Sequence, residues 1–378
     1  MPYNMILVII MTVQFTIVNL RRHIFASDDG LTTPMDKKYE GMQKIYKLSD
    51  IHPAQMMING NMEFENIPME TIINEFIRNT DFKKLKTIEE IKNKFIDFLA
   101  KYCPQSSCDE YIEFIVGRFK EDLKAEIAEN GFDNVIETRR KKKIYPFIKK
   151  YSSFNDEFED ITPENRDKEK YTELLWQMFS WNLKYEGTGV IISGHDINSP
   201  YPSYFEINAH CNDPDGIIYE ELESKIDFED TLIRIYAINE EGYAFFTGVH
   251  DEFIDFISKY INETNEVIVH RLKSKLKEEK INAPDKIIEI VENTITTEYS
   301  DVNDEIINFK SKGICETSKS IEFIPNHLLC ILADEIIRLT AMKQKISSED
   351  EYVSMNSHIS LMTKANGFKW IKFNNEII

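Results

Sequence analysis

The order of the predicted secondary structure constrains this chain more than any other feature, because strands open and close it while helices fill the middle. Residues 12–17 alternate polar and apolar side chains, which is the period of a half-buried strand. Near the other end, an Asn-Gly turn at 366–367 joins two apolar runs and predicts a hairpin. Sheets at both ends with helices between them favour a layered α+β fold over an alternating parallel sheet.

The other elements follow from hydrophobic periods of two residues for strands and about 3.6 for helices. Strands are predicted at 12–20, 23–27, 44–48, 55–58, 189–193, 203–208, 231–238, 243–246, 357–363 and 368–373. Helices are predicted around 72–77 and 88–98, and at 109–128, 251–279, 283–296 and 328–345. The charged, weakly patterned stretch 139–170 predicts a surface excursion, and no internal repeat is evident.

Composition limits the partners and cofactors. The 378 residues allow one large domain or two ordinary ones, and the formal net charge of −20 repels phosphate backbones, so no nucleic-acid partner is predicted. The basic run 139–143 is interpreted as a solvated helix end or loop.

The odd cysteine count of 5 predicts reduced thiols in a cytoplasmic protein. No second Cys or His pair joins Cys103 and Cys108, so neither a metal nor a cofactor is predicted.

The apolar stretch Met5–Val18 is open to two interpretations, a strand or a membrane anchor. It is shorter than the roughly 20 residues that span a bilayer, and Arg21 and Arg22 follow it instead of preceding it. Polar residues also alternate through its second half. We therefore expect a strand from Thr12 onward and regard a membrane tether as the disfavoured alternative.

Three residues in this strand pattern have the spacing of a catalytic group. Thr12 opens the first strand, Asp28 closes the returning strand sixteen residues later, and Lys44 opens the next strand after sixteen more. A threonine at the start of a chain can act as a nucleophile, because its α-amine, with a pKa of roughly 8, serves as general base. A nearby lysine lowers the pKa of its neighbours by like-charge repulsion, and an aspartate holds that lysine in place.

These residues resemble the proteasome β-subunit family, including the bacterial HslV-type peptidases. The match is Thr12, an Ala26-x-Asp28 motif and Lys44, without a gap. A nearer resemblance, to a group of uncharacterised bacterial N-terminal-nucleophile (Ntn) hydrolase-like proteins, is carried by 44–49 with His52-Pro53 and by 367–372. The resemblance implies a four-layer αββα sandwich with Thr12 as nucleophile and with Asp28 and Lys44 tuning it. It covers most of 12–378 as a single domain, with helical insertions at about 100–170 and 263–320.

The resemblance implies further site residues and a processed N-terminus. Gly60, displaced by about two residues from the family's position, stands for the glycine whose amide forms the oxyanion hole, and Ser354 and Glu351 stand for a conserved serine and the acid before it. Met355 and Asn356 replace two glycines that pass close to the nucleophile, and larger side chains there narrow the site. Residues 1–11 are interpreted as a propeptide or a mis-assigned start, because the mechanism requires a free amine on Thr12.

Two functions remain open at this point. The first is an Ntn threonine peptidase or amidase that cleaves a peptide or amide substrate. The alternative is a catalytically inactive member of the same fold that acts as an assembly or binding module. The resemblance implies self-association, and because no nucleotide-binding motif is present, any ATP use would come from a separate ATPase partner. His195 and Asp196 are interpreted as turn residues, and no chemistry is assigned to the remaining histidines.

Overall fold

The computed structural model describes most of the chain. The described residues are 12–32, 38–49, 51–104, 108–132, 135, 161–163, 168–183, 187–213, 216–237, 240–278, 305–306, 308–347, 353–373 and 376–377. The proposed propeptide 1–11, the site candidate Glu351, the predicted helix 283–296 and most of the predicted excursion 139–170 lie outside these residues.

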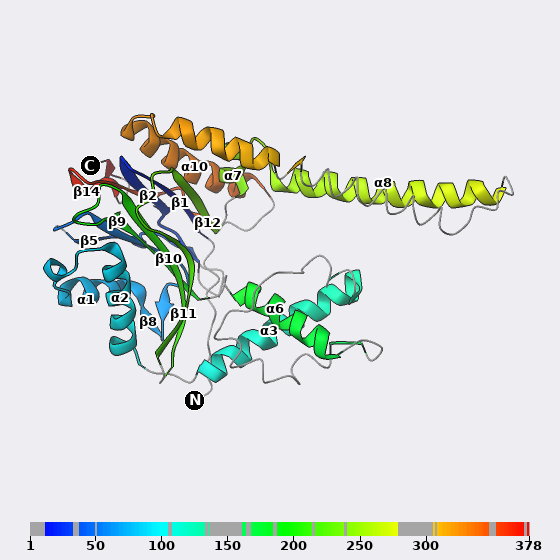
Figure 1. Cartoon of the computed structure of the whole chain (residues 1–378), viewed down its shortest axis with the longest axis horizontal. Helices are drawn as coiled ribbons and strands as arrows, with labels where there is room; N and C mark the ends of the chain where they lie inside the picture. The colour runs from blue at the N-terminus through cyan, green and yellow to red at the C-terminus, as the bar shows by residue number, and fades with distance from the viewer. Residues whose placement is uncertain are drawn as a thin grey trace.

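Two antiparallel sheets form the centre of the molecule (Figure 1). The first contains β1 (Val13–Asn19), β2 (Arg22–Asp28), β12 (Leu232–Ala237), β13 (Ser357–Thr363), β14 (Gly367–Phe373) and β15 (Glu376–Ile377). Its strand order is β12-β1-β2-β13-β14-β15, so the two ends of the described chain meet in one sheet. The hairpin predicted around the Asn-Gly turn is confirmed as the β13–β14 pair.

The second sheet has five strands. They are β5 (Ile45–Ser49), β6 (Ala54–Gly60), β9 (Thr188–His195), β10 (Pro202–Asp213) and β11 (Gly216–Lys225). The order is β11-β10-β9-β6-β5, and every neighbouring pair is antiparallel. Two short hairpins lie outside both sheets: β3 (Leu31–Thr32) with β4 (Lys38–Tyr39), and β7 (Glu63–Phe64) with β8 (Ile67–Pro68).

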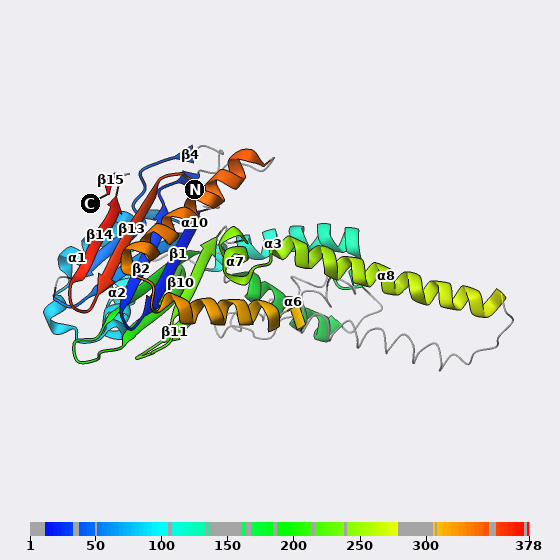
Figure 2. The ribbon, with the colours of Figure 1, turned by 90° about the horizontal axis from the view of Figure 1, so that it is seen from above.

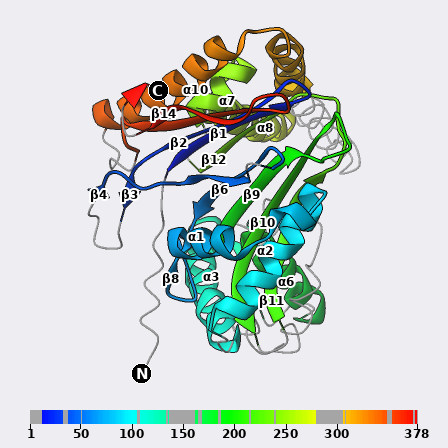
Figure 3. The same ribbon diagram turned by 90° about the vertical axis from the view of Figure 1, so that its left-hand side faces the viewer.

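Helices α1 (Met69–Asn79) and α2 (Ile88–Tyr102) cover the outer face of the five-stranded sheet (Figure 3). Their apolar faces, including Phe76 and Phe95, pack in one cluster with Met56 and Ile58 of β6. The start of α2 is defined by a capping box, in which the side chain of Thr87 accepts from the third residue of the helix. Burial of these amphipathic faces attaches both helices to the sheet.

Helices α7 (Glu240–Thr247) and α10 (Asn326–Ile346) cover the outer face of the six-stranded sheet (Figure 2). Val13, Phe15 and Ile17 are alternate residues of β1, and all three lie in the cluster that contains the buried face of α10. Phe15 also stacks on Phe246 of α7, with ring centroids 5.7 Å apart. The period of two predicted for this strand is therefore confirmed by which side chains face the helices, but the strand is buried on both faces and not half-buried, because the second sheet covers its other side.

The inner faces of the two sheets pack against each other. Val18 and Phe25 of the first sheet share a cluster with Met57, Ile191 and Tyr204 of the second. Polar side chains lie between the sheets as well, and many are fully buried: Gln14, Thr16, His23, Gln55, Ser193, His195 and Ser360. The predicted α+β class is confirmed, and the layer between the sheets is unusually polar for a buried interface.

Three helices lie outside this body. They are α3 (Cys108–Asn130), α6 (Lys168–Leu183) and α8 (Asp251–Glu278). Phe119 of α3 and Phe179 of α6 pack together in a cluster that also includes Cys211 of β10, whereas α8 extends away from the sheets (Figure 1). Within the described parts of the chain, no helix has the length and apolar character needed to cross a membrane.

One secondary-structure prediction and the prediction about the thiols are wrong. Residues 243–246 were expected to form a strand but belong to α7, because a short apolar run has no period that separates strand from helix. Here Gly242 lets α7 approach β12 so closely that a Cβ would collide with Ile235. The second error concerns the thiols: Cys211 is disulfide-bonded, whereas Cys103, Cys315 and Cys330 are free as predicted.

Candidate active site

Thr12 lies directly before β1, at the end of the first sheet where β2 returns to it. The hairpin is tight because the side-chain oxygen of Asn19 accepts from the backbone N–H groups of Arg21 and Arg22. The register pairs Gln14 with Ser27, so Asp28 arrives beside Thr12. Thr12 is fully buried. Antiparallel pairing therefore brings together two residues that are sixteen positions apart.

Lys44 reaches the same place from the other sheet. It precedes β5, and its carbonyl accepts from the N–H of Ile58 in β6 at 3.0 Å. The carbonyl of Ile58 accepts a hydrogen bond from the side chain of Gln14 at 2.6 Å, and this bond links β6 to β1. The side chain of Lys44 is fully buried and crosses the gap between the sheets toward Thr12.

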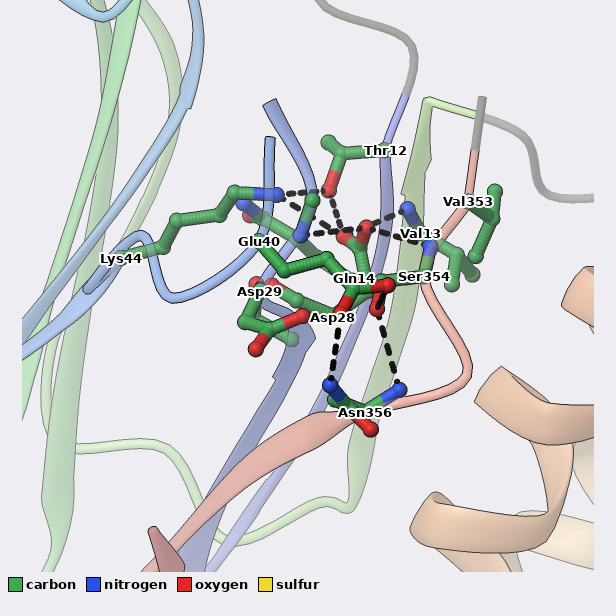
Figure 4. Close-up of polar contacts among 12 residues, drawn as sticks. Thr12, Val13, Gln14, Asp28, Asp29, Glu40, Lys44, Val353, Ser354 and Asn356 are labelled. Carbon is green, nitrogen blue, oxygen red and sulfur yellow. Dashed lines mark hydrogen bonds and ion pairs between the residues drawn. The ribbon is translucent and has the colours of Figure 1, made fainter. Parts of the chain in front are cut away.

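Thr12, Asp28 and Lys44 form one hydrogen-bonded group (Figure 4). The ammonium nitrogen Nζ of Lys44 lies 2.6 Å from Oγ1 of Thr12 and 2.9 Å from Oδ1 of Asp28. The Thr12 hydroxyl also donates to that same Oδ1. All three side chains are shielded from solvent, and a buried charge pair is tolerated only when its remaining hydrogen-bonding capacity is satisfied.

Backbone N–H groups hold the carboxylate of Asp28. Val13 N donates to Oδ1 at 3.3 Å, while Gly30 N and Ser354 N donate to Oδ2 at 3.1 and 3.2 Å. A Cβ on Gly30 would lie 2.7 Å from Oδ2, so only glycine allows this approach. The carboxylate therefore has fixed donors on both oxygens, and it presents Oδ1 to Thr12 and Lys44.

A second group of contacts links the three loops that surround Asp28. The Ser354 hydroxyl donates to Glu40 at 3.4 Å, and Asn356 donates through its side chain to Glu40 and through its N–H to Ser354. Asp29 accepts from Gly41 N through its side chain at 3.1 Å. Sequence reasoning missed Glu40, because the loop that carries it shows no pattern and its partners are more than 300 residues away.

The two residues that replace the family's glycines do not fill the space at Thr12. The side chain of Asn356 turns to Glu40, on the far side of Asp28 from Thr12 (Figure 4). Met355 packs against the apolar cluster beneath α10. Among the described residues, both side chains therefore make their contacts away from Thr12, and the expected narrowing is not seen.

The remaining predicted site residues are differently placed. Gly60 ends β6 in register with Thr188, two residues beyond the Ile58 that pairs with Lys44. Its φ of 68° and its approach to Gly187 require glycine there for reasons of backbone geometry. Glu351 lies outside the described residues. The structure thus brings together Thr12, Asp28, Lys44 and Ser354.

The opposite end of the inter-sheet layer holds a pair of histidines. His23 Nε2 lies 2.9 Å from His195 Nε2, and His23 Nδ1 lies 2.5 Å from Ser193 Oγ. Both rings are fully buried, and burial lowers the pKa of His23 well below its usual value and that of His195 to about 4. The turn role expected for His195 is wrong for its side chain, which lies between the sheets. Asp196, in contrast, does lie in the turn and accepts from Ile88 N at the start of α2.

Comparison with known proteins adds no family to this description: no family model matches the chain, and no curated protein matches it.

Proposed function

We propose that this chain is an Ntn hydrolase with the four-layer αββα sandwich of the proteasome type, and that Thr12 is its nucleophile. The single observation that carries the proposal is the contact of Lys44 Nζ with both Thr12 Oγ1 and Asp28 Oδ1, at 2.6 and 2.9 Å. Helices on the outer faces of two packed antiparallel sheets support the fold. The substrate class is an amide bond, in a peptide or otherwise.

The chemistry requires Thr12 to be the first residue. Its free α-amine then takes the hydroxyl proton as Oγ1 attacks the carbonyl carbon, and it returns that proton to the leaving nitrogen as the amide C–N bond breaks. Water then hydrolyses the ester left on Oγ1, with the amine again acting as base. The ammonium of Lys44 lowers the pKa of the adjacent amine and hydroxyl, and Asp28 holds Lys44 in position.

The same group accounts for release of the amine. Thr12 follows eleven residues in the sequence, so its nitrogen is part of the Met11–Thr12 peptide bond until that bond is cut, either by self-processing or, in a chain whose translation begins at Met11, by methionine removal. Attack of Oγ1 on the Met11 carbonyl carbon would convert that peptide bond into an ester and protonate the nitrogen. Hydrolysis of the ester then separates residues 1–11 and frees the amine.

Partners and location follow from the same proposal. We propose self-association, a separate ATPase as the source of any ATP dependence, and a cytoplasmic location. The free thiols of Cys103, Cys315 and Cys330 support this location, whereas the disulfide of Cys211 counts against it.

The test is the N-terminus of the protein purified from its own host, measured by intact mass and sequencing. We expect a chain that begins at Thr12 and that reacts covalently at Thr12 with a β-lactone. Thr12→Ser should be cut and labelled, whereas Thr12→Ala should be neither, although it keeps the fold. A wild-type chain that begins at Met1 or Met11 and resists the β-lactone would establish the alternative, an inactive module with this fold.

A further inference from the structure

The outer face of α10 carries a continuous row of large apolar side chains. The exposed fractions are 47% for Leu328, 54% for Ile331, 52% for Leu339, 45% for Met342 and 79% for Ile346. Together with Glu335, these residues recur at intervals of three and four, which is the spacing of one stripe along a helix. Single exposed apolar residues are ordinary on protein surfaces, but five aligned on one helix mark an interaction surface.

The opposite face of α10 is already occupied. Ala333, Ile336, Ile337 and Ala341 are buried against the six-stranded sheet. The helix therefore has two apolar faces, of which the fold buries one. A helix that only covers a sheet needs one apolar face, and the rest of its surface is normally polar.

We infer that α10 pairs antiparallel with α10 of a second copy of this chain, about a two-fold axis that crosses the helix between Ile336 and Ile337. About this axis Ile331 lies opposite Met342 of the partner, and Leu328 lies opposite Lys345, next to the partner's Ile346. The interface is isologous, so each of these contacts occurs twice.

The charges at the centre of the stripe favour a second copy over another occupant. The same axis places Glu335, in the middle of the stripe, opposite Arg338 of the partner, which flanks the stripe, so opposite charges meet twice across the axis. Arg338 already has an exposed contact with Asp334 at 3.6 Å, four residues earlier. Such a pair is worth only about 0.3–0.5 kcal/mol, so it does not prevent Arg338 from meeting Glu335 across the axis.

The size of the surface limits the affinity. A helix of 21 residues is about 30 Å long, and one helix pair buries less than the roughly 800 Å² per partner of a standard interface. The dimer is therefore expected to dissociate with a Kd on the order of micromolar.

The test is light scattering with size exclusion and sedimentation of the full chain, from about 1 to about 100 μM, a range that brackets such a Kd. We expect a concentration-dependent dimer for the wild type. Glu335→Arg and Arg338→Glu should each be monomeric, because each places like charges at the centre. An equimolar mixture of the two variants should regain the dimer, and so should the double variant, because both restore opposite charges.

Two controls keep the result interpretable. Lys84→Glu, an exposed charge reversal beside α1, should leave the dimer unchanged, and every variant should keep the wild-type unfolding temperature as a monomer. Leu339→Asp should abolish the dimer without altering the fold. A wild type that is monomeric at about 100 μM, single variants that still dimerise, or a mixture that stays monomeric would each overturn this interface.

Discussion

The two ends of the layer between the sheets are equally buried, yet they carry their polar groups in opposite ways. At one end, Asp28 and Lys44 are ionised partners with fixed hydrogen bonds. At the other, the rings of His23 and His195 contact each other, His23 also contacts the Ser193 hydroxyl, and burial depresses the pKa of both rings. A buried group must be either paired or neutral, and this molecule uses one solution at each end.

The comparison also separates function from packing. A charged group beside a hydroxyl polarises it, so the Thr12 end is arranged for chemistry. The neutral imidazoles of the histidine pair hydrogen-bond to each other and to Ser193, so buried polar atoms of the pair have partners although neither ring is charged. The following predictions test this difference, beginning with the largest effect.

Removing one member of the ionised pair should have the largest effect. Asp28→Asn leaves the ammonium of Lys44 buried without its counter-charge, so we expect a loss of about 3–5 kcal/mol in the free energy of unfolding. Urea denaturation followed by circular dichroism measures it. The double variant Asp28→Asn with Lys44→Met should recover much of that loss, because no charge remains buried. A single variant as stable as the wild type would show that the pair is not ionised in the folded state.

Acid should destabilise the histidine end. The pKa of His195 falls from 6.5 to about 4 on folding, so the unfolded chain binds its proton first as the pH falls. Stability is complete above pH 6.5 and is lost between 6.5 and about 4, by about 3 kcal/mol for this group. Denaturation across this pH range, compared with His195→Gln, isolates the contribution. An equal slope in both proteins would contradict it.

A matched pair of glycine substitutions compares the rigidity of the two ends. A Cβ at Gly30 would lie 2.7 Å from Asp28 Oδ2, and one at Gly194 would collide with the carbonyl of Pro53. Overpacking costs about 1–3 kcal/mol. We expect Gly194→Ala to reduce stability more, because the Pro53 carbonyl is backbone and cannot rotate away from the new Cβ. We expect Gly30→Ala to reduce β-lactone labelling of Thr12 more. Thermal unfolding and β-lactone labelling measure the two effects, and equal labelling in both variants would count against the role of Asp28.

The smallest effect is expected at the rim. Glu40 is exposed, and it accepts from Ser354 and Asn356 at 3.4 and 3.3 Å. Glu40→Gln should therefore change stability by less than about 1 kcal/mol. Its effect should appear instead in the rate of Thr12 labelling, because Glu40 connects the loop before Lys44 to Ser354. A stability loss comparable with that of Asp28→Asn would show that the loops depend on this carboxylate.

Much of the fold was accessible from local patterns. The strands at both ends and the helices at 251–279 and 328–345 were predicted within a few residues, because long periodic segments determine their own period. β11 was missed, because Tyr219 and Leu222 are apolar yet exposed on an edge strand, so no clean alternation marks it. The helix α7 was misassigned because four apolar residues carry no period.

The candidate site likewise contains residues that local patterns indicate and residues that only the tertiary structure reveals. The sixteen-residue spacing of Thr12, Asp28 and Lys44 is readable because two strands and a turn set it, and these are local events. The contacts of Ser354, Glu40 and Asn356 with this group depend on β13 pairing with β2, which no local pattern contains. The partnership of His23 with His195 likewise requires one sheet to pack on the other.

The sequence by itself determined most of the segments that form strands and helices, and which three residues would stand at strand ends, because periodicity and turn length act over a few residues. Only the tertiary structure decided which of those ends meet, since burial between two sheets depends on the register and packing of strands that are hundreds of residues apart. The same packing leaves one face of α10 buried and the other exposed, although both are apolar in the sequence.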